Sequence, residues 1–406
     1  MAKQNVREIA SPSLFHKLYG IRKPKTTYYG RDWLDYALMI LLSAVVVRFS
    51  YRHNQIMSMV GFVLCGFVLI TFIIRHGIEL RVPVILKRPQ EVLYLFIYKL
   101  QNLRPAYFIA LGALLLENIA ISATPNLPHH VEMMRRVAFG LFYIHFILIT
   151  VYRTAILFGH LKRRELVREV LMQTPWRRVI RERTNITLEI VHAYCTGVLT
   201  HLILIAPWYL VITYSRFSIV FLPISCLVSV MIQVRWLKVF NEWLYRDHWL
   251  GHNSECEFIF LHGSHHDAIP SGLIAVAENG FLEGFLRFTL GSPLAFYNPV
   301  VSSLIFTREI RKDINLHQYI PGLFPRIPRV VMEVFQHARH HYGELEPYGL
   351  AIKTDQPDKQ TNYESLFSDF PDKLRNSGRL DEELTGFKWD NASHRRILDL
   401  WDKYQK

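Results

Sequence analysis

The chain has 406 residues, of which half are apolar and 13% are Phe, Tyr or Trp, and its mean hydropathy is +0.13. This composition argues against the two or three soluble domains that the length alone would allow, and it predicts an integral membrane protein. The formal charge of +13 does not indicate nucleic-acid binding. Most of the excess Lys and Arg lies beside apolar runs, where these residues set topology and contact anionic headgroups.

The first two parts of the chain are a polar arm and an apolar block. Residues 1–31 carry seven Lys/Arg and no apolar core of a signal peptide, so we expect a basic cytoplasmic arm and no cleavable leader. Residues 32–236 form the transmembrane helix block. We expect six spans, over about residues 33–47, 56–74, 106–121, 137–158, 194–214 and 219–236, and an amphipathic interfacial piece at residues 92–98.

The charges of the connecting segments predict the topology. Residues 1–31, 75–105 and 160–183 carry 7, 6 and 8 Lys/Arg, whereas the three connections on the other side carry 2, 2 and 1. Because Lys and Arg accumulate on the cytoplasmic side, we expect both termini in the cytoplasm.

Residues 237–350 follow the last span and form the predicted catalytic cap. The sixth span continues without a helix breaker to His248, which would stand roughly 18 Å beyond Trp236 at helical rise. Residues 281–306 are apolar but interrupted by Gly and Pro. We interpret them either as a re-entrant or interface-lying segment on a substrate path, or as a buried core helix of the cap. Residues 351–406 are expected to be a polar cytoplasmic tail.

Nine of the 19 His lie between positions 248 and 341. They form one H-x-x-x-H box, one H-x-x-H-H box, a single His and a second H-x-x-H-H box: His248 and His252; His262, His265 and His266; His317; His337, His340 and His341. On a helix, residues at i, i+3 and i+4 share a face, and neutral imidazole is a common ligand of iron, zinc and copper. So many imidazoles exceed the needs of one ion and predict a two-metal site on the cytoplasmic face.

The order of these boxes resembles the fatty acid hydroxylase/sterol desaturase superfamily of membrane-bound, histidine-box diiron oxygenases. The segment His262-Gly-Ser-His265-His266 is similar to the second box of that family, and His337-Ala-Arg-His340-His341 is similar to its closing box. His317 is followed by Pro321, as in the single His before the last box. Asn279 stands where many members have a further His.

The resemblance implies an all-α integral membrane protein whose cytoplasmic helical cap holds two iron ions, with all nine His as metal ligands and O2 as co-substrate. It also implies hydroxylation of an unactivated C–H bond of a lipid, of fatty acyl, sphingoid or sterol-like type. Donor chemistry alone admits zinc as well as iron. Asn279 is a candidate additional ligand, and nearby acids are candidates for orienting the ligands: Asp247, Glu257, Asp267 and Glu333.

The chain itself contains no recognisable redox module. It has no G-x-G-x-x-G after a strand, no C-x-x-C pair, and only four Cys. We therefore expect neither an iron–sulfur cluster nor a thiolate metal site. The electrons would therefore come from a partner such as a ferredoxin, a rubredoxin or a b-type cytochrome system. The polar N-terminus favours a bacterial inner membrane as the location.

Three alternatives remain open at this level. The same diiron core could support desaturation or oxidative C–C cleavage, because the fate of the substrate radical depends on pocket geometry. A metal transporter would need sites within the spans, where the sequence offers only His145 and His201, which look isolated and are expected to pack or form hydrogen bonds. A structural dizinc membrane protein is the third alternative.

Overall fold

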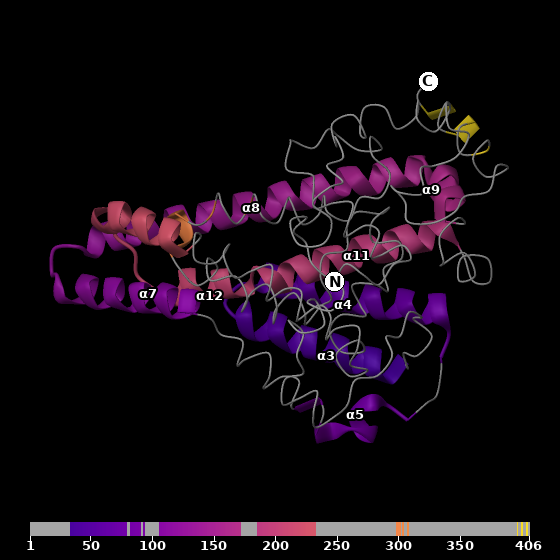
Figure 1. Cartoon of the computed structure of the whole chain (residues 1–406), viewed down its shortest axis with the longest axis horizontal. Coiled ribbons are helices and arrows are strands. Elements are labelled where there is room, and N and C mark those ends of the chain that lie inside the picture. The colour runs from indigo at the N-terminus through magenta and orange to yellow at the C-terminus, as the bar shows by residue number, and fades with distance from the viewer. Residues whose placement is uncertain are drawn as a thin grey trace, which may run out of the picture.

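The computed structural model describes residues 33–78, 82–90, 92–93, 105–171, 185–232, 298–301, 303, 307, 396, 399–400 and 403–404 (Figure 1). All regular structure in these ranges is helical. The elements are α3 (Trp33–Ser50), α4 (Gln55–His76), α5 (Val84–Lys87), α7 (Pro105–Ala123), α8 (Pro128–Lys162), α9 (Arg164–Leu171), α11 (Ile186–Leu204), α12 (Ala206–Tyr214) and the 3-10 turn η2 (Ile219–Phe221).

Four helical stretches are long and apolar enough to cross a membrane: Trp33–Ser50, Gln55–Arg75, Pro128–Lys162 and Ile186–Tyr214. The predictions of an all-helical chain and of membrane-type helices are therefore confirmed at this coarse level. Two further apolar helices, Phe108–Ala123 and Ile219–Ile232, coincide with the third and sixth expected spans but are shorter. Residues 233–236 of the sixth expected span lie outside the described ranges.

Two helices differ in extent from the sequence expectation. The fourth expected span covered residues 137–158, but α8 begins at Pro128, because proline is well suited to the first position of a helix. The fifth was expected as one helix over residues 194–214. The structure begins it at Ile186 after the capping residue Asn185 and divides it at Ile205. Pro207, which lacks an N–H group, follows this break.

The ends of α4 show the expected local chemistry. The side chain of Asn54 accepts a hydrogen bond of 3.1 Å from the backbone N–H of Met57, which satisfies one of the donors left free at a helix start. At the other end Gly77 has φ 68°, a left-handed conformation that glycine adopts without steric cost. Its N–H donates to the carbonyl of Ile73 at 2.7 Å.

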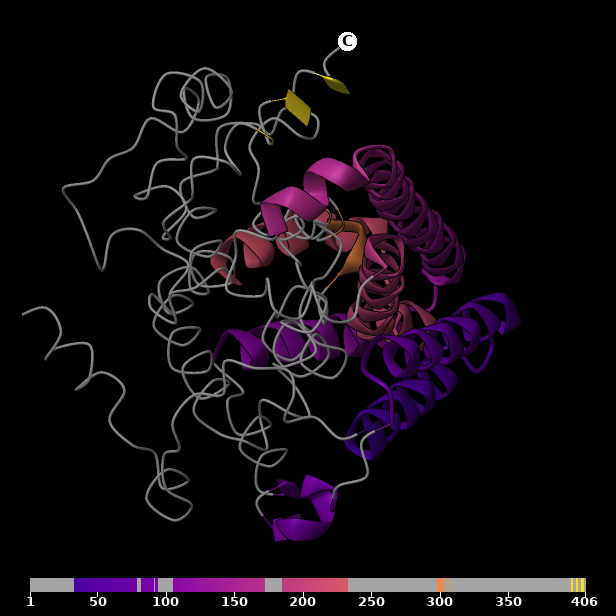
Figure 2. The same ribbon diagram turned by 90° about the vertical axis from the view of Figure 1, so that its right-hand side faces the viewer.

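The central element is the helix formed by α11 and α12. Buried residues make up 94% of the apolar window in Ile186–Tyr214, against 28% in Pro128–Lys162. α11 packs against α4, α8, α3, α9 and α12. Figure 2 shows it between the α3–α4 pair and α8. The outer helices therefore carry the surface that a lipid phase would contact.

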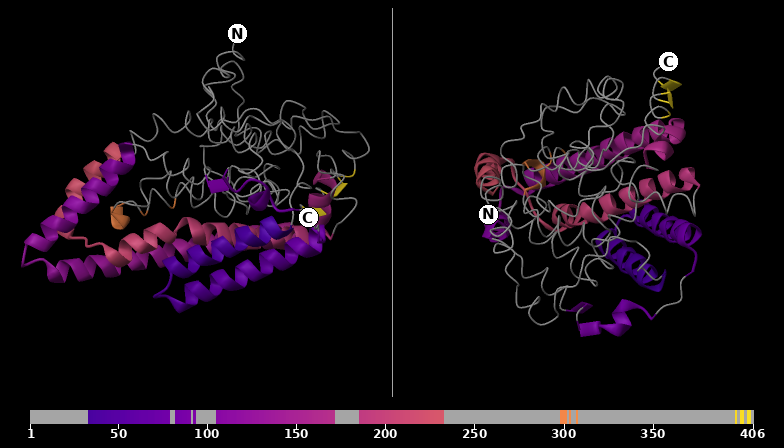
Figure 3. Two further views of the ribbon diagram at one scale, coloured as in Figure 1. Left: turned by 90° about the horizontal axis from the view of Figure 1, so that it is seen from below. Right: turned by 45° about the vertical axis from the view of Figure 1, so that its right-hand side comes forward.

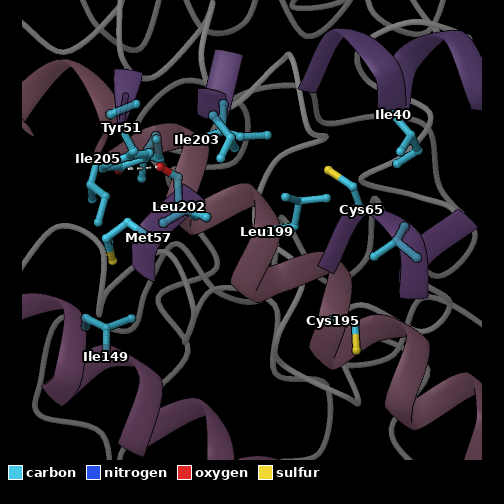
Figure 4. Packing of buried hydrophobic residues seen from close by; sticks show 14 of the residues in the cluster. Ile40, Tyr51, Met57, Cys65, Ile149, Cys195, Leu199, Leu202, Ile203 and Ile205 are labelled. Atoms are coloured by element: carbon cyan, nitrogen blue, oxygen red, sulfur yellow. Dashed lines mark hydrogen bonds between the residues drawn. The ribbon is translucent and has the colours of Figure 1, made fainter. Parts of the chain in front are cut away.

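The N-terminal pair α3 and α4 packs closely on α11. The Tyr51 hydroxyl, between α3 and α4, donates to the Leu202 carbonyl at 2.8 Å (Figure 4). The rings of Tyr36 and Phe72 stack with centroids 3.7 Å apart. A Cβ atom at Gly61 would overlap the side chain of Val47 and would lie 3.0 Å from that of Leu202. Glycine is thus required at this three-helix contact.

A buried ion pair joins the end of α4 to the start of α11. The Arg75 guanidinium donates to both carboxylate oxygens of Glu189, from Nε to Oε1 at 2.8 Å and from Nη2 to Oε2 at 2.6 Å. The two side chains are only 2% and 7% exposed. One turn further along, Thr71 contacts His192 with 2.6 Å between Oγ1 and Nδ1. These contacts fix one antiparallel register of α4 on α11.

A second helix pair diverges from this bundle. α7 packs on Ile219–Ile232 through small and apolar side chains, Ala110 and Ala113 against Val228 and Ile232. Figure 3 shows the pair leaving the line of α8 and α12 at an angle. Val300 packs between the two parts, so the described end of the broken apolar segment 281–306 lies among the apolar helices.

Part of the C-terminal region contacts α9. Arg396 pairs with Glu169 at 2.8 Å and Lys403 with Glu165 at 2.9 Å. The Lys403 ammonium group lowers the pKa of the Glu165 carboxyl below its ordinary value. Leu400, which lies between Arg396 and Lys403 in the sequence, is buried. The predicted arm of residues 1–31, most of the cap and most of the tail lie outside the described ranges.

We predict that Gly61→Ala destabilises the folded chain by about 1–3 kcal/mol, because overpacking forces neighbouring side chains out of place. At Gly66, in the same helix, an added Cβ atom would meet no other atom within 4 Å. Gly66→Ala should therefore be neutral or stabilising by about 0–1 kcal/mol. Thermal unfolding of both variants in detergent checks this, and equal behaviour would contradict the close α3–α4–α11 contact.

We predict that Glu189→Gln costs about 3–5 kcal/mol, because it leaves a buried guanidinium without its countercharge. Glu132 pairs with Arg136 on the surface, with side chains 53% and 80% exposed. Glu132→Gln is the matched control and should change stability by only about 0–0.5 kcal/mol. Unfolding curves measure the free energy of unfolding of the two variants. Similar decreases in both would show that the Arg75–Glu189 pair does not hold α4 on α11.

Candidate functional site

The histidine boxes lie outside the residues that the structure describes. This holds for all nine box histidines, for the candidate ligand Asn279 and for the nearby acids Asp247, Glu257, Asp267 and Glu333. The two-metal site therefore stays a prediction. Within the described ranges, no group of three or more His, Cys, Asp or Glu side chains could hold a metal ion.

The described helices bring together a polar group that we call the inner histidine cluster: His145, Arg153, His201, Trp208 and Thr307. The rings of His145 and His201 have centroids 5.1 Å apart with an interplanar angle of 37°. The Trp208 ring meets His145 edge-on, also at 5.1 Å. The view of His145 and His201 as isolated residues is therefore wrong, whereas the expectation that they pack or form hydrogen bonds is confirmed.

Helix periodicity explains why these side chains meet. The buried side of α8 includes Ala138, Phe142, His145, Ile149 and Arg153, which recur every three or four residues and so lie along one stripe. This stripe faces α11, the helix of His201, and the start of α12. The pairing follows from the packing of α8 on α11, which sequence spacing within either helix cannot indicate.

The contact with Thr307 fixes the orientation of the His145 ring. Thr307 Oγ1 donates its one hydrogen to the Ser303 carbonyl at 2.8 Å. The same oxygen lies 2.8 Å from His145 Nδ1; while the hydroxyl donates to Ser303, it accepts from the imidazole and Nδ1 carries the proton. In neutral His145, Nε2 is then the atom with the lone pair, able to accept a hydrogen bond or ligate a metal.

Two other buried histidines, His192 and His160, also have a polar contact at Nδ1. His192 Nδ1 faces Thr71 Oγ1 at 2.6 Å, and that hydroxyl donates to the Phe67 carbonyl at 2.8 Å. His160 Nδ1 lies 3.0 Å from the Ile156 carbonyl, which can only accept. His160 therefore carries the proton on Nδ1, and His192 does so while the Thr71 hydroxyl donates to the Phe67 carbonyl. Such bonds orient an imidazole and raise its basicity at Nε2.

Positive charge already lies beside the inner histidine cluster. Arg153 is fully buried and close enough to interact electrostatically with both His145 and His201. A guanidinium group keeps its charge in proteins. This charge opposes the gain of a further positive charge by either ring.

The sequence contained one usable signal for this cluster. Polar and ionisable residues are costly inside apolar helices and usually mark functional positions. His145 and Arg153 interrupt the apolar part of α8, and His201 interrupts that of α11. Thr307 gave no such signal, because its role depends on the packing of residues 298–307 against the helices.

No protein-family model, no curated protein and no solved structure matches the chain. The family resemblance therefore rests on the residues of the histidine boxes alone. The arrangement of apolar helices carries no family information of its own, because fold does not determine function.

We predict that Thr307→Val destabilises the chain by about 1–3 kcal/mol, because it leaves the buried His145 Nδ1–H without its acceptor. Thr213 offers a matched control, since its hydroxyl donates within its own helix, to the Tyr209 carbonyl at 2.8 Å. Thr213→Val should change stability by less than about 0.5 kcal/mol. Thermal unfolding in detergent measures both, and a neutral Thr307→Val would show that this contact does not anchor the segment.

Proposed function

We propose that the protein is a membrane-bound non-haem diiron oxygenase that hydroxylates an unactivated C–H bond of a lipid, using O2 and two electrons from a redox partner. The observation that carries this proposal is the set of nine His in the order H-x-x-x-H, H-x-x-H-H, H and H-x-x-H-H, which follows the apolar helix Ile219–Ile232 in the sequence. This order resembles the fatty acid hydroxylase/sterol desaturase superfamily.

The donor set fits a pair of borderline metal ions. Nine imidazoles supply enough nitrogen ligands for two ions, and imidazole suits iron as well as zinc. His248, His252, His262, His265, His266, His317, His337, His340 and His341 would hold the pair. The bound irons would supply O2 activation and abstraction of the substrate hydrogen. Asn279 would act as a further ligand, with Asp247 and Asp267 orienting the imidazoles.

The apolar helices would hold this site beside its substrate. Long acyl chains and sterol rings partition into lipid, so an enzyme that acts on them gains from a site near the membrane surface. Exposed apolar side chains occur along α4 and α8, such as Phe62, Phe67, Ile144 and Leu148, as expected for helices in contact with lipid. In our proposal, both termini and the histidine boxes face the cytoplasm of a bacterial inner membrane.

The segment that includes Asn298–Thr307 would link the helices to the site. Its Thr307 bonds to His145 inside the bundle, and ten residues later in sequence comes His317. We infer that this segment lines the path by which a lipid reaches the irons, with the inner histidine cluster at its side. A ferredoxin, rubredoxin or b-type cytochrome partner would deliver electrons at the basic cytoplasmic face.

Desaturation and oxidative C–C cleavage are variants of the same proposal, because the histidine boxes do not distinguish them. A metal transporter is the second candidate, and one observation favours it: His145 and His201 lie side by side within apolar helices, where transport sites occur. The buried charge of Arg153 beside both rings disfavours it. A structural dizinc protein would share the boxes but have no turnover.

Metal analysis combined with lipid analysis tests the proposal. We predict about two irons per purified chain, and loss of metal together with activity in His265→Ala and in His340→Ala. His53→Ala, at an exposed position between α3 and α4, is the matched control and should keep both. Cells that contain the protein should accumulate a lipid heavier than its precursor by one oxygen atom.

The other outcomes select among the alternatives. A product lighter by two hydrogen atoms would indicate desaturation. Tight zinc without turnover would favour a structural site, and metal flux into vesicles would favour transport. Retention of full metal by both box variants would remove the two-metal assignment altogether.

A further inference from the structure

A buried carboxyl group lies in the second helix pair, away from the inner histidine cluster. Glu117, in α7, is only 7% exposed. One turn before it, Leu114 packs in an apolar cluster with Met134, Val211 and Phe217. An ionised carboxylate in such surroundings is costly unless it is paired and hydrogen-bonded.

The groups around Glu117 are uncharged and mostly carry oxygen. The Ser225 hydroxyl donates to Glu117 Oε2 at 3.5 Å, and the Asn298 amide donates to Ser225 Oγ at 3.3 Å. The backbone N–H of Ser218 and the side-chain amide of Asn298 also lie near the carboxyl group. Glu117 Oε1 is buried and has no hydrogen-bond partner among the described residues.

A second hydroxyl without a partner in the described ranges lies on the same helix face. Ser229 comes one turn after Ser225 and is 1% exposed, and its Oγ makes no hydrogen bond there. The contact of Ala110 with Ile232 shows that this face of the helix packs against α7. Two buried oxygen atoms, on Glu117 and Ser229, therefore lie along the contact between α7 and Ile219–Ile232. Neither atom has a hydrogen-bond partner among the described residues.

No basic side chain among the described residues neutralises Glu117. Arg216 and Arg135 bond to other groups: Arg216 donates from its backbone N–H to Asn118 and from its guanidinium to Ser122. Arg135 donates to the Ser215 carbonyl at 3.3 Å. None of the ion pairs in the described ranges includes Glu117.

We propose that Glu117, Ser225 and Ser229 form a binding site for a small monovalent cation, a proton or Na⁺, with Asn298 holding Ser225 in place. Carboxylate and hydroxyl oxygens are hard ligands that suit small, hard cations. One positive charge neutralises the single carboxylate. A divalent ion would bring an uncompensated charge into the apolar core.

The proposed cation site includes a contact with Asn298, which begins the described residues that precede His317 in the sequence. Asn298 Oδ1 accepts from the backbone N–H groups of Val300 and Val301, so it caps the helical turn that starts at Pro299. Thr307, at the other described end, contacts His145. A cation on Glu117 therefore stabilises the polar contacts that fix where this segment begins. The cation site does not depend on the identity of the metals in the histidine boxes.

Two measurements on the purified full chain test the site and separate the two cations. Infrared spectra show whether a carboxylic acid C=O band, distinct from that of ionised carboxylates, is present near neutral pH and absent in Glu117→Gln. Thermal unfolding in NaCl and in choline chloride shows whether Na⁺ raises the Tm of the wild type and not that of Glu117→Gln. We expect the acid band if the bound cation is a proton, or the Na⁺-dependent Tm if it is Na⁺. Glu132→Gln, at an exposed position, should behave as the wild type in both measurements.

A wild-type chain with neither the acid band nor a Na⁺-dependent Tm overturns the proposal without any variant. If Glu117→Gln does not fold, Ser229→Ala takes its place, since it removes one of the site's oxygen atoms. It should shift the acid band or reduce the effect of Na⁺, and an unchanged band and unchanged Tm response in Ser229→Ala would also count against the site. None of these readouts requires iron or turnover, so their failure is distinct from failure of the proposed function.

Discussion

The arrangement of the helices depends on the buried ion pair between Arg75 and Glu189. Two charges inside an apolar block stabilise it only when their geometry is nearly ideal, and this pair is bidentate. Arg75 lies at the C-terminal end of α4 and Glu189 in the first turn of α11, so both helix dipoles favour the charges. The contacts of Thr71 with His192 and of Gly61 with Leu202 follow in the same antiparallel register. A shift of α4 along α11 would break all three at once.

The polar residues of α11 define the interior of the protein. Glu189, His192, Thr196, Thr200 and His201 are all buried in a helix whose neighbours turn apolar side chains outward. In a lipid phase such residues are retained where they pair with one another or with other helices. The bundle is therefore organised around a polar central helix, with apolar faces at its periphery. The hydrogen bonds at Nδ1 of His145, His160 and His192 show that these rings are oriented by specific contacts and not merely buried.

The sequence predicted the helical class and the positions of the apolar helices, because apolar runs and Lys/Arg-rich connections are local signals. It did not predict the division at Ile205, although Pro207 was visible, because a proline can occupy the first turn of a new helix without ending the apolar run. It also treated His145 and His201 as isolated, since their contact arises only when α8 packs on α11. Glu117 stands near the end of an apolar run, but its partners come from Ser225 and Asn298, which are far away in the chain. The histidine boxes are a local pattern, and their prediction rests on spacing alone.

The contact of Tyr51 with the Leu202 carbonyl has a consequence for biogenesis. Near the division at Ile205 the backbone loses part of its regular hydrogen bonding, because Pro207 has no N–H to offer the Ile203 carbonyl. The Tyr51 hydroxyl, supplied by the N-terminal hairpin, bonds to the adjacent carbonyl at 2.8 Å. The hairpin of α3 and α4 is synthesised before α11. It can thus serve as an intramolecular template that receives the divided helix, so that the order of translation matches the order of assembly.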